Sequence, residues 1–222
     1  MKTLHALLLA MLPVAALAQE ITPQSQPLKF GINAGATYAG IRGNNEAEKS
    51  DYALDYLVGV SLEVPLSERL SLITNLNYER ISYKRDYYVE NPNFDPFLPP
   101  DGYEITVRAT MQYLTLPVNL KYYVGASKKF YINGGAFAGY FLDGISKVNG
   151  DKINDDYSIF KDFNFGANLG VGVRFPVSDT SDINIELRDN LGLANISKVP
   201  VVGDGSVKTN SVNLMVIWQF GL

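Results

Sequence analysis

Eight segments of this sequence carry apolar residues at every second position, and this period constrains the fold more than any other feature. A period of two is typical of a β-strand with two unlike faces, whereas a surface helix repeats its apolar residues every three or four positions. The sequence therefore predicts an all-β fold. The expected strands are at about 28–40, 53–65, 70–83, 105–123, 129–142, 163–175, 182–193 and 211–220.

The connections between these segments alternate between short and long. Short turns follow the second, fourth and sixth segments, at 65–69, 125–128 and 176–181, and the other connections are longer and rich in Asp, Asn, Gly and Pro. Transmembrane barrels of bacterial outer membranes show this order, with short periplasmic turns and longer external loops. We expect residues 28–222 to form an eight-stranded, antiparallel, up-and-down transmembrane β-barrel with both termini in the periplasm.

The first residues predict a secretory signal peptide. Lys2 supplies a positive start, residues 6–17 are almost purely apolar, and Ala16-Leu17-Ala18 gives the small-x-small pattern before Gln19. The apolar run is too short to span a membrane as a helix. We expect residues 1–18 to be a cleaved signal peptide and residues 19–27 to be a periplasmic N-terminal leader.

Composition excludes several classes of function. The chain has no cysteine, and its only histidine, His5, lies within the predicted signal peptide. The mature chain would then lack the side chains for a Ser-His-Asp site and for a histidine- or cysteine-ligated metal. With 19 Lys and Arg against 23 Asp and Glu, it also lacks a basic footprint for nucleic acid. We expect no catalytic activity, no cofactor, no metal ion and no nucleic-acid partner.

Acidic residues nevertheless gather in the long connections. A carboxylate pair can act as acid and base, and GDKINDD (150–156) offers oxygen ligands for calcium without the spacing or the closing Glu of an EF-hand loop. Solvated loops are normally rich in such residues, so both signals are weak. The residues concerned are Asp51, Asp86, Asp95, Asp101, Asp151, Asp155 and Asp156.

The polar faces of two segments indicate which side of each strand points into the barrel. These faces consist of small residues, although repeated glycine weakens a strand unless space is limiting, as it is inside an eight-stranded barrel. We predict that they line the lumen and that the opposite, apolar faces contact lipid. The inward residues are Gly31, Asn33, Gly35, Thr37 and Ala39 in the first segment, and Asn164, Gly166, Asn168, Gly170 and Gly172 in the sixth.

Aromatic residues fall near both ends of the predicted strands, as expected for belts at the two membrane interfaces. The band between them is about 20–30 Å tall once strand tilt is included. The periplasmic set is Phe30, Tyr122, Phe130, Phe175, Trp218 and Phe220, and the outer set is Tyr38, Tyr56, Tyr78, Tyr140 and Phe163.

Six charged residues share the inward phase and carry three charges of each sign. Because buried charges need partners, we predict an ion-pair network that fills the lumen and leaves no open pore. The alternative is that Glu79 and Arg174 lie in wet strand ends beyond the membrane. The six are Glu63, Glu79, Lys121, Arg174, Glu186 and Arg188.

The stretches YLTLPVNLKYY (113–123) and FYINGGAFAGYFLDG (130–144), with the last strand, resemble a known family. This is the outer-membrane β-barrel domain family, specifically its PorT-like group of small barrels related to the OmpA/OmpX type. The resemblance covers about 28–222 and implies a location in the outer membrane of a Gram-negative bacterium. It does not imply a chemical reaction. Some relatives take part in type IX protein secretion, and membership does not imply that role here.

The resemblance extends to the last strand, which is similar to the C-terminal signal read by the barrel insertion machinery. Val212, Leu214, Val216, Trp218 and Phe220 share one face, and the chain departs from the usual pattern by ending in Gly221-Leu222. We therefore expect the insertion machinery and outer-membrane lipid as partners.

The second long loop, 84–104, is the best candidate for a further contact. Tyr87, Tyr88, Phe94, Phe97 and Leu98 place apolar groups among prolines, which predicts contact with a protein or a glycan. We expect a structural or interaction role that assists a secretion or surface assembly. The alternatives are a small passive porin and a secreted lipocalin-like binder.

Pro117 interrupts an otherwise regular strand. A closed barrel has no free edge to shelter a residue without an N–H group, and the apolar phase of Ile105, Val107 and Met111 is opposite to that of Leu114 and Leu116. A shift of one residue is what a β-bulge produces. We predict a bulge or a broken ladder bond within 112–118.

Overall fold

The computed structural model describes residues 27–90, 101–155, 157–201 and 205–221. The predicted signal peptide and nearly all of the predicted leader lie outside these residues. The described part holds nine strands: β1 (Lys29–Arg42), β2 (Asp51–Pro65), β3 (Leu70–Val89), β4 (Tyr103–Val124), β5 (Phe130–Val148), β6 (Asp151–Ile153), β7 (Phe163–Pro176), β8 (Ser181–Gly192) and β9 (Lys208–Gly221). Two short 3-10 helices, η1 (Ala47–Lys49) and η2 (Tyr157–Ile159), lie in the long connections.

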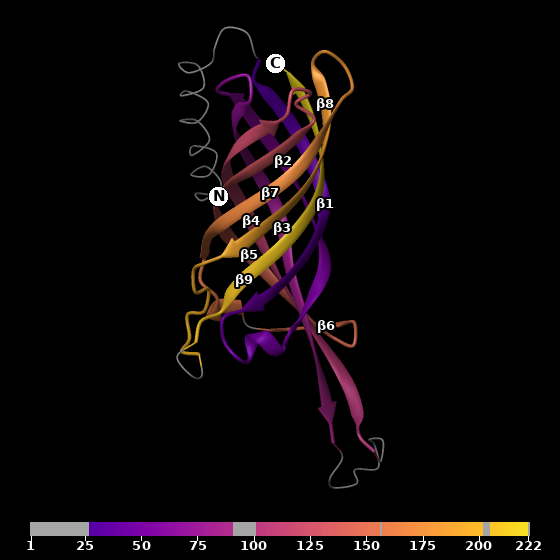
Figure 1. Cartoon of the computed structure of the whole chain (residues 1–222). Helices are drawn as coiled ribbons and strands as arrows, with labels where there is room; N and C mark the ends of the chain where they lie inside the picture. The colour runs from indigo at the N-terminus through magenta and orange to yellow at the C-terminus, as the bar shows by residue number, and fades with distance from the viewer. Residues whose placement is uncertain (1–26, 91–100, 156, 202–204, 222) are drawn as a thin grey trace.

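Eight of these strands close into an antiparallel barrel (Figure 1). The strand order is β4-β3-β2-β1-β9-β8-β7-β5, and a further pairing of β4 with β5 completes the ring. The small strand β6 is an addition that pairs with the end of β5. Each barrel strand therefore neighbours the strands before and after it in the chain, and the predicted up-and-down barrel is confirmed.

Both ends of the barrel chain lie at the end that carries the short turns. Lys29 pairs with Gly221, so the first and last strands start and finish side by side. At the opposite end, β3 and β4 continue as a hairpin well beyond the other strands (Figure 1). An even number of strands places the two termini at the same end, as the sequence predicted.

The assignment of the two faces is confirmed. In β1, Asn33 and Thr37 are buried in the lumen, whereas Ile32 is 47% and Tyr38 51% exposed. In β7, Asn164 and Asn168 are buried and Leu169 is 67% exposed. A surface with so many exposed large apolar side chains is unfavourable in water and favourable in the hydrocarbon of a lipid bilayer.

Space inside the barrel explains the inward glycines. A Cβ added at Gly172 would lie 2.2 Å from the ring of Tyr131, and one added at Gly35 would lie 2.3 Å from the carbonyl oxygen of Leu214. Both distances are shorter than any tolerated carbon contact. The glycines therefore make room for large side chains that cross the lumen and for close approach of neighbouring strands.

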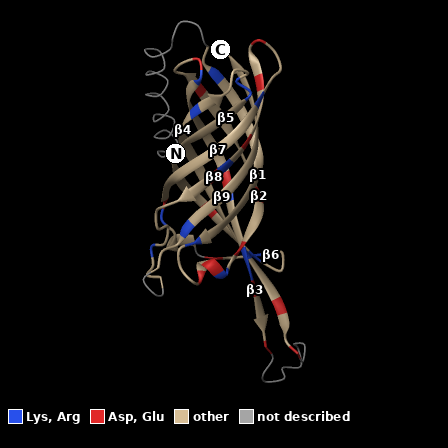
Figure 2. Cartoon of the chain, in the orientation of Figure 1, with Lys and Arg blue, Asp and Glu red and all other residues tan. Residues whose placement is uncertain are grey.

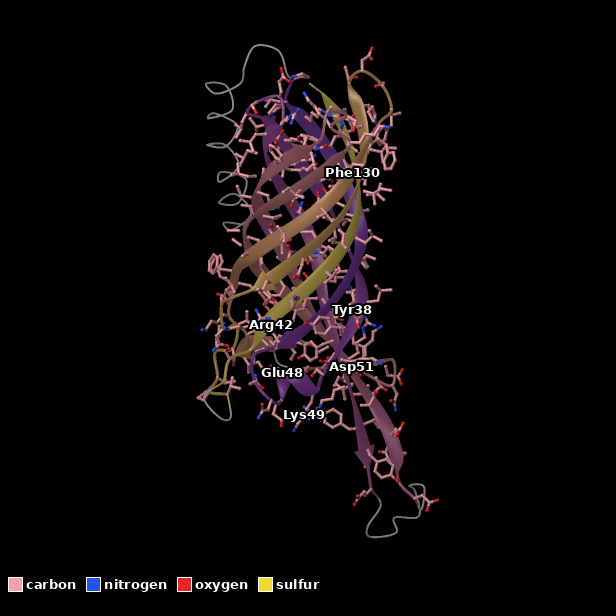
Figure 3. The ribbon with its side chains drawn as sticks, viewed as in Figure 1. Tyr38, Arg42, Glu48, Lys49, Asp51 and Phe130 are labelled. Atoms are coloured by element: carbon pink, nitrogen blue, oxygen red, sulfur yellow. The ribbon has the colours of Figure 1, made fainter. Side chains whose placement is uncertain are left out.

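The predicted aromatic residues lie on the outward faces near the two ends of the strands. Figure 3 shows Phe130 near the end with the short turns and Tyr38 toward the opposite end. Tyr140 and Phe163 stand opposite each other in the ladder, with ring centroids 5.4 Å apart, and Phe30 and Phe220 pair in the same way at 5.9 Å. Such cross-strand pairs add to sheet stability beyond their burial. No helix among the described residues is long and apolar enough to cross a membrane.

The predicted irregularity near Pro117 is present. The ladder between β3 and β4 passes from Thr74–Val118 to Asn77–Thr115, so it is interrupted at Pro117, which has no N–H group to donate. The Thr74 hydroxyl donates to the Pro117 carbonyl at 3.0 Å. The ladder between β4 and β5 also shifts by one residue at Gln112 and Tyr113.

The reason offered for this irregularity is wrong. The shift comes from an extra residue in β5, Leu142, and β4 keeps one alternation throughout, with Ala109, Met111, Tyr113 and Lys121 all buried on the inner side. The apolar phase changes because the interior of the barrel changes: it is polar along the lipid-facing band and apolar at the end with the long connections.

Candidate functional site

The lumen is the most distinctive feature of the molecule, because it is filled by polar side chains. Asparagines from facing and neighbouring strands bond to one another: Asn33 Nδ2 donates to Asn77 Oδ1 at 2.7 Å, and Asn119 Nδ2 donates to Asn133 Oδ1 at 3.2 Å. A short amide supplies a donor and an acceptor in little space. The inward phase of each strand thus produces a packed polar interior.

Two buried ion pairs lie within this interior, one between strands β2 and β4 and one within strand β8. Lys121 Nζ lies 2.8 Å from Glu63 Oε2, and the Tyr123 hydroxyl donates to Glu63 Oε1 at 2.8 Å. Arg188 Nη2 lies 2.5 Å from Glu186 Oε1, and Arg188 Nη1 donates to Asn75 of β3 at 3.1 Å. These four charged residues are at most 1% exposed, so four of the six predicted lumen charges form ion pairs in the interior.

The other two predicted residues do not join such pairs. Glu79 is 1% exposed and sits inside the barrel, where Ser211, Asn213 and Asn190 donate to its Oε1 atom, and no cation lies within ion-pair distance among the described residues. Arg174 lies at the end with the short turns, 3.7 Å from Asp182. A single six-residue network is therefore wrong; for Arg174 the alternative, a wet strand end, fits its partly exposed side chain.

Sequence reasoning missed two charges at this same end. Lys29 forms an ion pair with Asp182, whose carboxylate also faces Arg174. Both share the inward phase of their strands, since Asp182 is four residues before Glu186 and Lys29 is two before Gly31. Extending the phase to the strand ends would have found them. An open cavity of about 250 Å³, lined by Lys29, Glu63 and other residues, forms a vestibule here.

An apolar cluster closes the other end of the lumen. Lumen-facing Ile41, Ile81, Met111 and Tyr113 pack there with Ile196 from a long connection. The rings of Phe141, Tyr157 and Phe160 lie against this cluster. The segments that the sequence left as loops therefore contribute to a hydrophobic cap over the barrel.

The prediction that residues 84–104 form a loop is wrong at both ends, where the structure has paired strands. Pairing of β2 with β3 ends at Lys84 and pairing of β5 with β4 ends at Val107, but β3 and β4 continue to pair with each other as far as Val89 and Tyr103. The result is a two-stranded hairpin that projects from the barrel. Tyr87 and Tyr88 are 43% and 59% exposed on it. The predicted contact residues Phe94, Phe97 and Leu98 lie outside the described residues.

A second cavity, of about 330 Å³, lies at the base of this hairpin. Its lining is apolar at Ile41 and Val107 and charged at Glu46 and Arg85. Arg85 Nη2 lies 3.1 Å from Glu46 Oε2 and ties the hairpin to the first long connection. Hydrogen bonds from Lys49 and Arg85 hold the pKa of the Glu46 carboxyl below its usual value.

The weak calcium candidate, 150–156, begins as a β-hairpin. Asn149 and Gly150 have φ angles of 50° and 97°, which suit a type I′ turn between β5 and β6. The dipeptide Asn-Gly is a strong sequence signal for such a turn, and the sequence analysis overlooked it. No group of three or more metal-ligating side chains occurs in the described part of the chain.

The sequence profile of a family described as "outer membrane protein beta-barrel domain" matches residues 18–198. Among solved structures, neisserial surface protein A is 14% identical, with a TM-score of 0.43 and coverage of 87% of this chain and 97% of that one. OprG from Pseudomonas aeruginosa is 12% identical (TM-score 0.47, coverage 89% and 98%), and outer membrane protein W of E. coli is 16% identical (0.41, 90% and 100%). No curated protein matches the sequence.

Proposed function

We propose a structural or interaction role for this chain, which belongs to the outer membrane protein beta-barrel domain family and so to the outer membrane of Gram-negative bacteria. The observation that carries the proposal is the filled barrel: two buried ion pairs lie within the lumen, Arg188 reaches across it to Asn75, and an apolar cluster caps it. A barrel filled in this way acts through its surfaces. We further propose that the short turns and both termini face the periplasm, with the long connections outside.

The projecting hairpin is the surface best suited to contact a partner. Beyond Lys84 in β3 and Thr106 in β4, whose backbone groups bond to Asn149, the two strands have no further strand neighbour in the described part of the chain, so their outer edges are open. Its exposed Tyr87 ring is held by Arg85, whose guanidinium carbon lies 5.0 Å from the ring centroid. A strand edge with fixed aromatic side chains can bind an extended segment of another protein or a glycan. This contact would assist a secretion or surface assembly, as in the PorT-like group.

Two other functions fit the structure less well. A secreted lipocalin-like binder needs its apolar face inside the barrel, and here that face is outside, with Ile32, Leu169 and Leu214 about half exposed or more. A small passive porin needs a continuous aqueous channel, which eight strands do not leave once side chains fill the interior.

Conductance separates the interaction role from the porin. We expect the purified protein in planar bilayers to give no stable open-channel current, and liposomes that contain it to show no swelling in small sugars. Folding is verified by the heat-dependent shift on gels. Stable single-channel steps from the folded protein would contradict the closed-lumen proposal and favour the porin.

Shortening the hairpin tests the contact surface. A variant that lacks residues 87–105 and joins Asp86 to Thr106 by Asn-Gly keeps Lys84 opposite Arg108. We expect it to fold and to lose partners that the intact protein recovers from gently solubilised membranes. The matched variant Tyr87→Ser/Tyr88→Ser keeps the hairpin and removes only the rings. Recovery of the same partners by all three forms would contradict a binding role for the hairpin.

A further inference from the structure

Four cationic side chains stand next to one another across the outer ends of four strands. The ladder pairs Lys84 of β3 with Arg108 of β4, Arg108 with Lys147 of β5, and Lys147 with Lys152 of β6. Residues directly opposite in an antiparallel ladder have Cβ atoms about 5 Å apart on the same face. Figure 2 shows blue residues where the hairpin leaves the barrel, at the base of β3. We call these four residues the basic row.

The basic row lies on the outer side of the barrel wall. Its neighbours along the strands, Ala109 in β4 and Ser146 in β5, are buried on the inner side, so Arg108 and Lys147 point outward. Lys147 and Lys152 are exposed. The side chains of Lys147 and Lys152 are therefore available to whatever surrounds the barrel at this height, whereas Lys84 and Arg108 are half-buried, and Arg108 donates to the Leu54 carbonyl at 2.6 Å.

The positive charge of the row is only partly compensated by the protein. Arg108 Nη2 lies 3.1 Å from Asp55 Oδ2, but Asp55 also pairs with Arg80, at 2.7 Å. Lys84, Lys147 and Lys152 form no ion pair within 4.0 Å among the described residues, although Asp51 stands opposite Lys84 in the ladder. Like charges directly opposite each other destabilise a sheet, so a row of four requires an external counter-charge or a functional reason.

The height of the row relative to the membrane indicates that lipid headgroups are the source of the external negative charge. On β3, Lys84 is six residues beyond Tyr78 of the outer aromatic belt, which is about 20 Å along the strand and about 15 Å along the barrel axis at a 40° tilt. Arg80 lies between them, its guanidinium carbon 5.2 Å from the ring centroid of Tyr56. Arg80 therefore lies just above the aromatic belt, and the basic row lies at the level of a large lipid headgroup. Both are on the same outer face as the lipid-facing side chains below them.

We propose that the basic row, with Arg80 beneath it, binds the phosphorylated sugar headgroup of a glycolipid in the outer leaflet. Several cations about 5 Å apart match a headgroup that carries several phosphates, and the acyl chains would lie on the apolar outer face of β3 to β5. Arginine can bind a phosphate with two parallel hydrogen bonds and lysine adds point charge. The inference rests on the proposed orientation, with the long connections outside.

The test uses the folded, full-length mature protein in zwitterionic micelles, where orientation in a membrane has no influence. Lipopolysaccharide and enzymatically dephosphorylated lipopolysaccharide are titrated separately, and binding is followed by co-migration with the protein on native gels. The variant Lys84→Gln/Lys147→Gln/Lys152→Gln removes three charges from the row. The control Lys129→Gln/Lys161→Gln/Lys198→Gln removes three charges elsewhere on the surface.

We expect dephosphorylation and the row variant each to weaken binding at least tenfold, and the control to change it less than twofold. Binding to the wild type should also weaken as salt is raised, because exposed charges are screened. Equal binding of both lipids, or an unaffected row variant that folds normally, would overturn the inference. Sucrose octasulfate that binds as tightly as the lipid would also overturn it, since the row would then recognise soluble polyanions.

Discussion

Glu63 and Glu79 show that two buried carboxylates in one lumen can be held in different ways. Glu63 faces Lys121 at 2.8 Å and accepts further hydrogen bonds from Tyr123 and Gln219. Among the described residues, Glu79 accepts hydrogen bonds from the neutral side chains of Asn190, Ser211 and Asn213 and from no cation. Their burial is the same, so any difference in the effect of neutralising them reports on the ion pair itself.

We expect Glu63→Gln to lower the free energy of unfolding by about 3–5 kcal/mol, because it leaves Lys121 buried without its counter-charge. Glu79→Gln should be neutral or stabilising, since an amide oxygen can replace the accepting atom and a buried charge is removed. The measurement is urea unfolding in micelles or bilayers, followed by Trp218 fluorescence. Equal destabilisation by both substitutions would show that the ion pair contributes nothing specific.

At the scale of the strand, the extra residue lies where the barrel changes its surroundings. Leu142 is inserted in β5 near the outer belt, whereas the ladder interruption at Pro117 lies within the lipid-facing band. Beyond Leu142, β5 stays paired with β4 as far as Val148, but its other edge pairs with β6 instead of β7, in a small hairpin around Asn149 and Gly150. Bulges at barrel rims redirect strands in this way.

The turn between β5 and β6 depends on glycine. Gly150 has a φ of 97°, which a β-branched residue does not adopt without strain, so Gly150→Val should cost about 1–3 kcal/mol locally. We expect faster hydrogen exchange of the β6 amides and unchanged protection in β7 to β9. Asn149→Gly, which permits the same turn, should leave β6 protected. Loss of protection throughout the barrel in Gly150→Val would mean that the small hairpin holds the whole fold.

The whole molecule is asymmetric along its axis. A charged vestibule lies at the end with the termini, and an apolar cap, a second cavity and the projecting hairpin lie at the other. To relate this asymmetry to function, one must know which end of the barrel faces the outside of the cell. The absence of cysteine from the sequence makes that direction simple to measure.

Glu104 stands opposite Tyr88, near the far end of the described hairpin. We expect Glu104→Cys to react with a membrane-impermeant maleimide in intact cells. Ser127→Cys, in the short turn after β4, should react only after the outer membrane is opened. Both positions are exposed in the protein, so accessibility of the side chain itself does not differ. The opposite labelling pattern would reverse the proposed orientation and remove the basis for placing the basic row in the outer leaflet.

Features that depend on neighbouring residues in one strand could be predicted from the sequence, whereas contacts between distant strands could not. Strand alternation is local, so the fold class, the lumen-facing phase of β1 and β7 and the burial of Glu63, Lys121, Glu186 and Arg188 could all be predicted. Pairing between side chains depends on which strands face each other across the lumen. Nothing in the sequence spacing says that Arg188 reaches Asn75 or that Glu79 meets only neutral partners.

The sequence by itself determined the barrel, its two faces and its polar, tightly filled interior, because a period of two and the sizes of the inward residues are properties of each strand alone. Only the tertiary structure decided where strands continue past the membrane and what closes the lumen. Lys84, Arg108, Lys147 and Lys152 are scattered along the chain, and the register of four strands brings them into one row. Register is set by closure of the whole ring, a condition that no single segment carries.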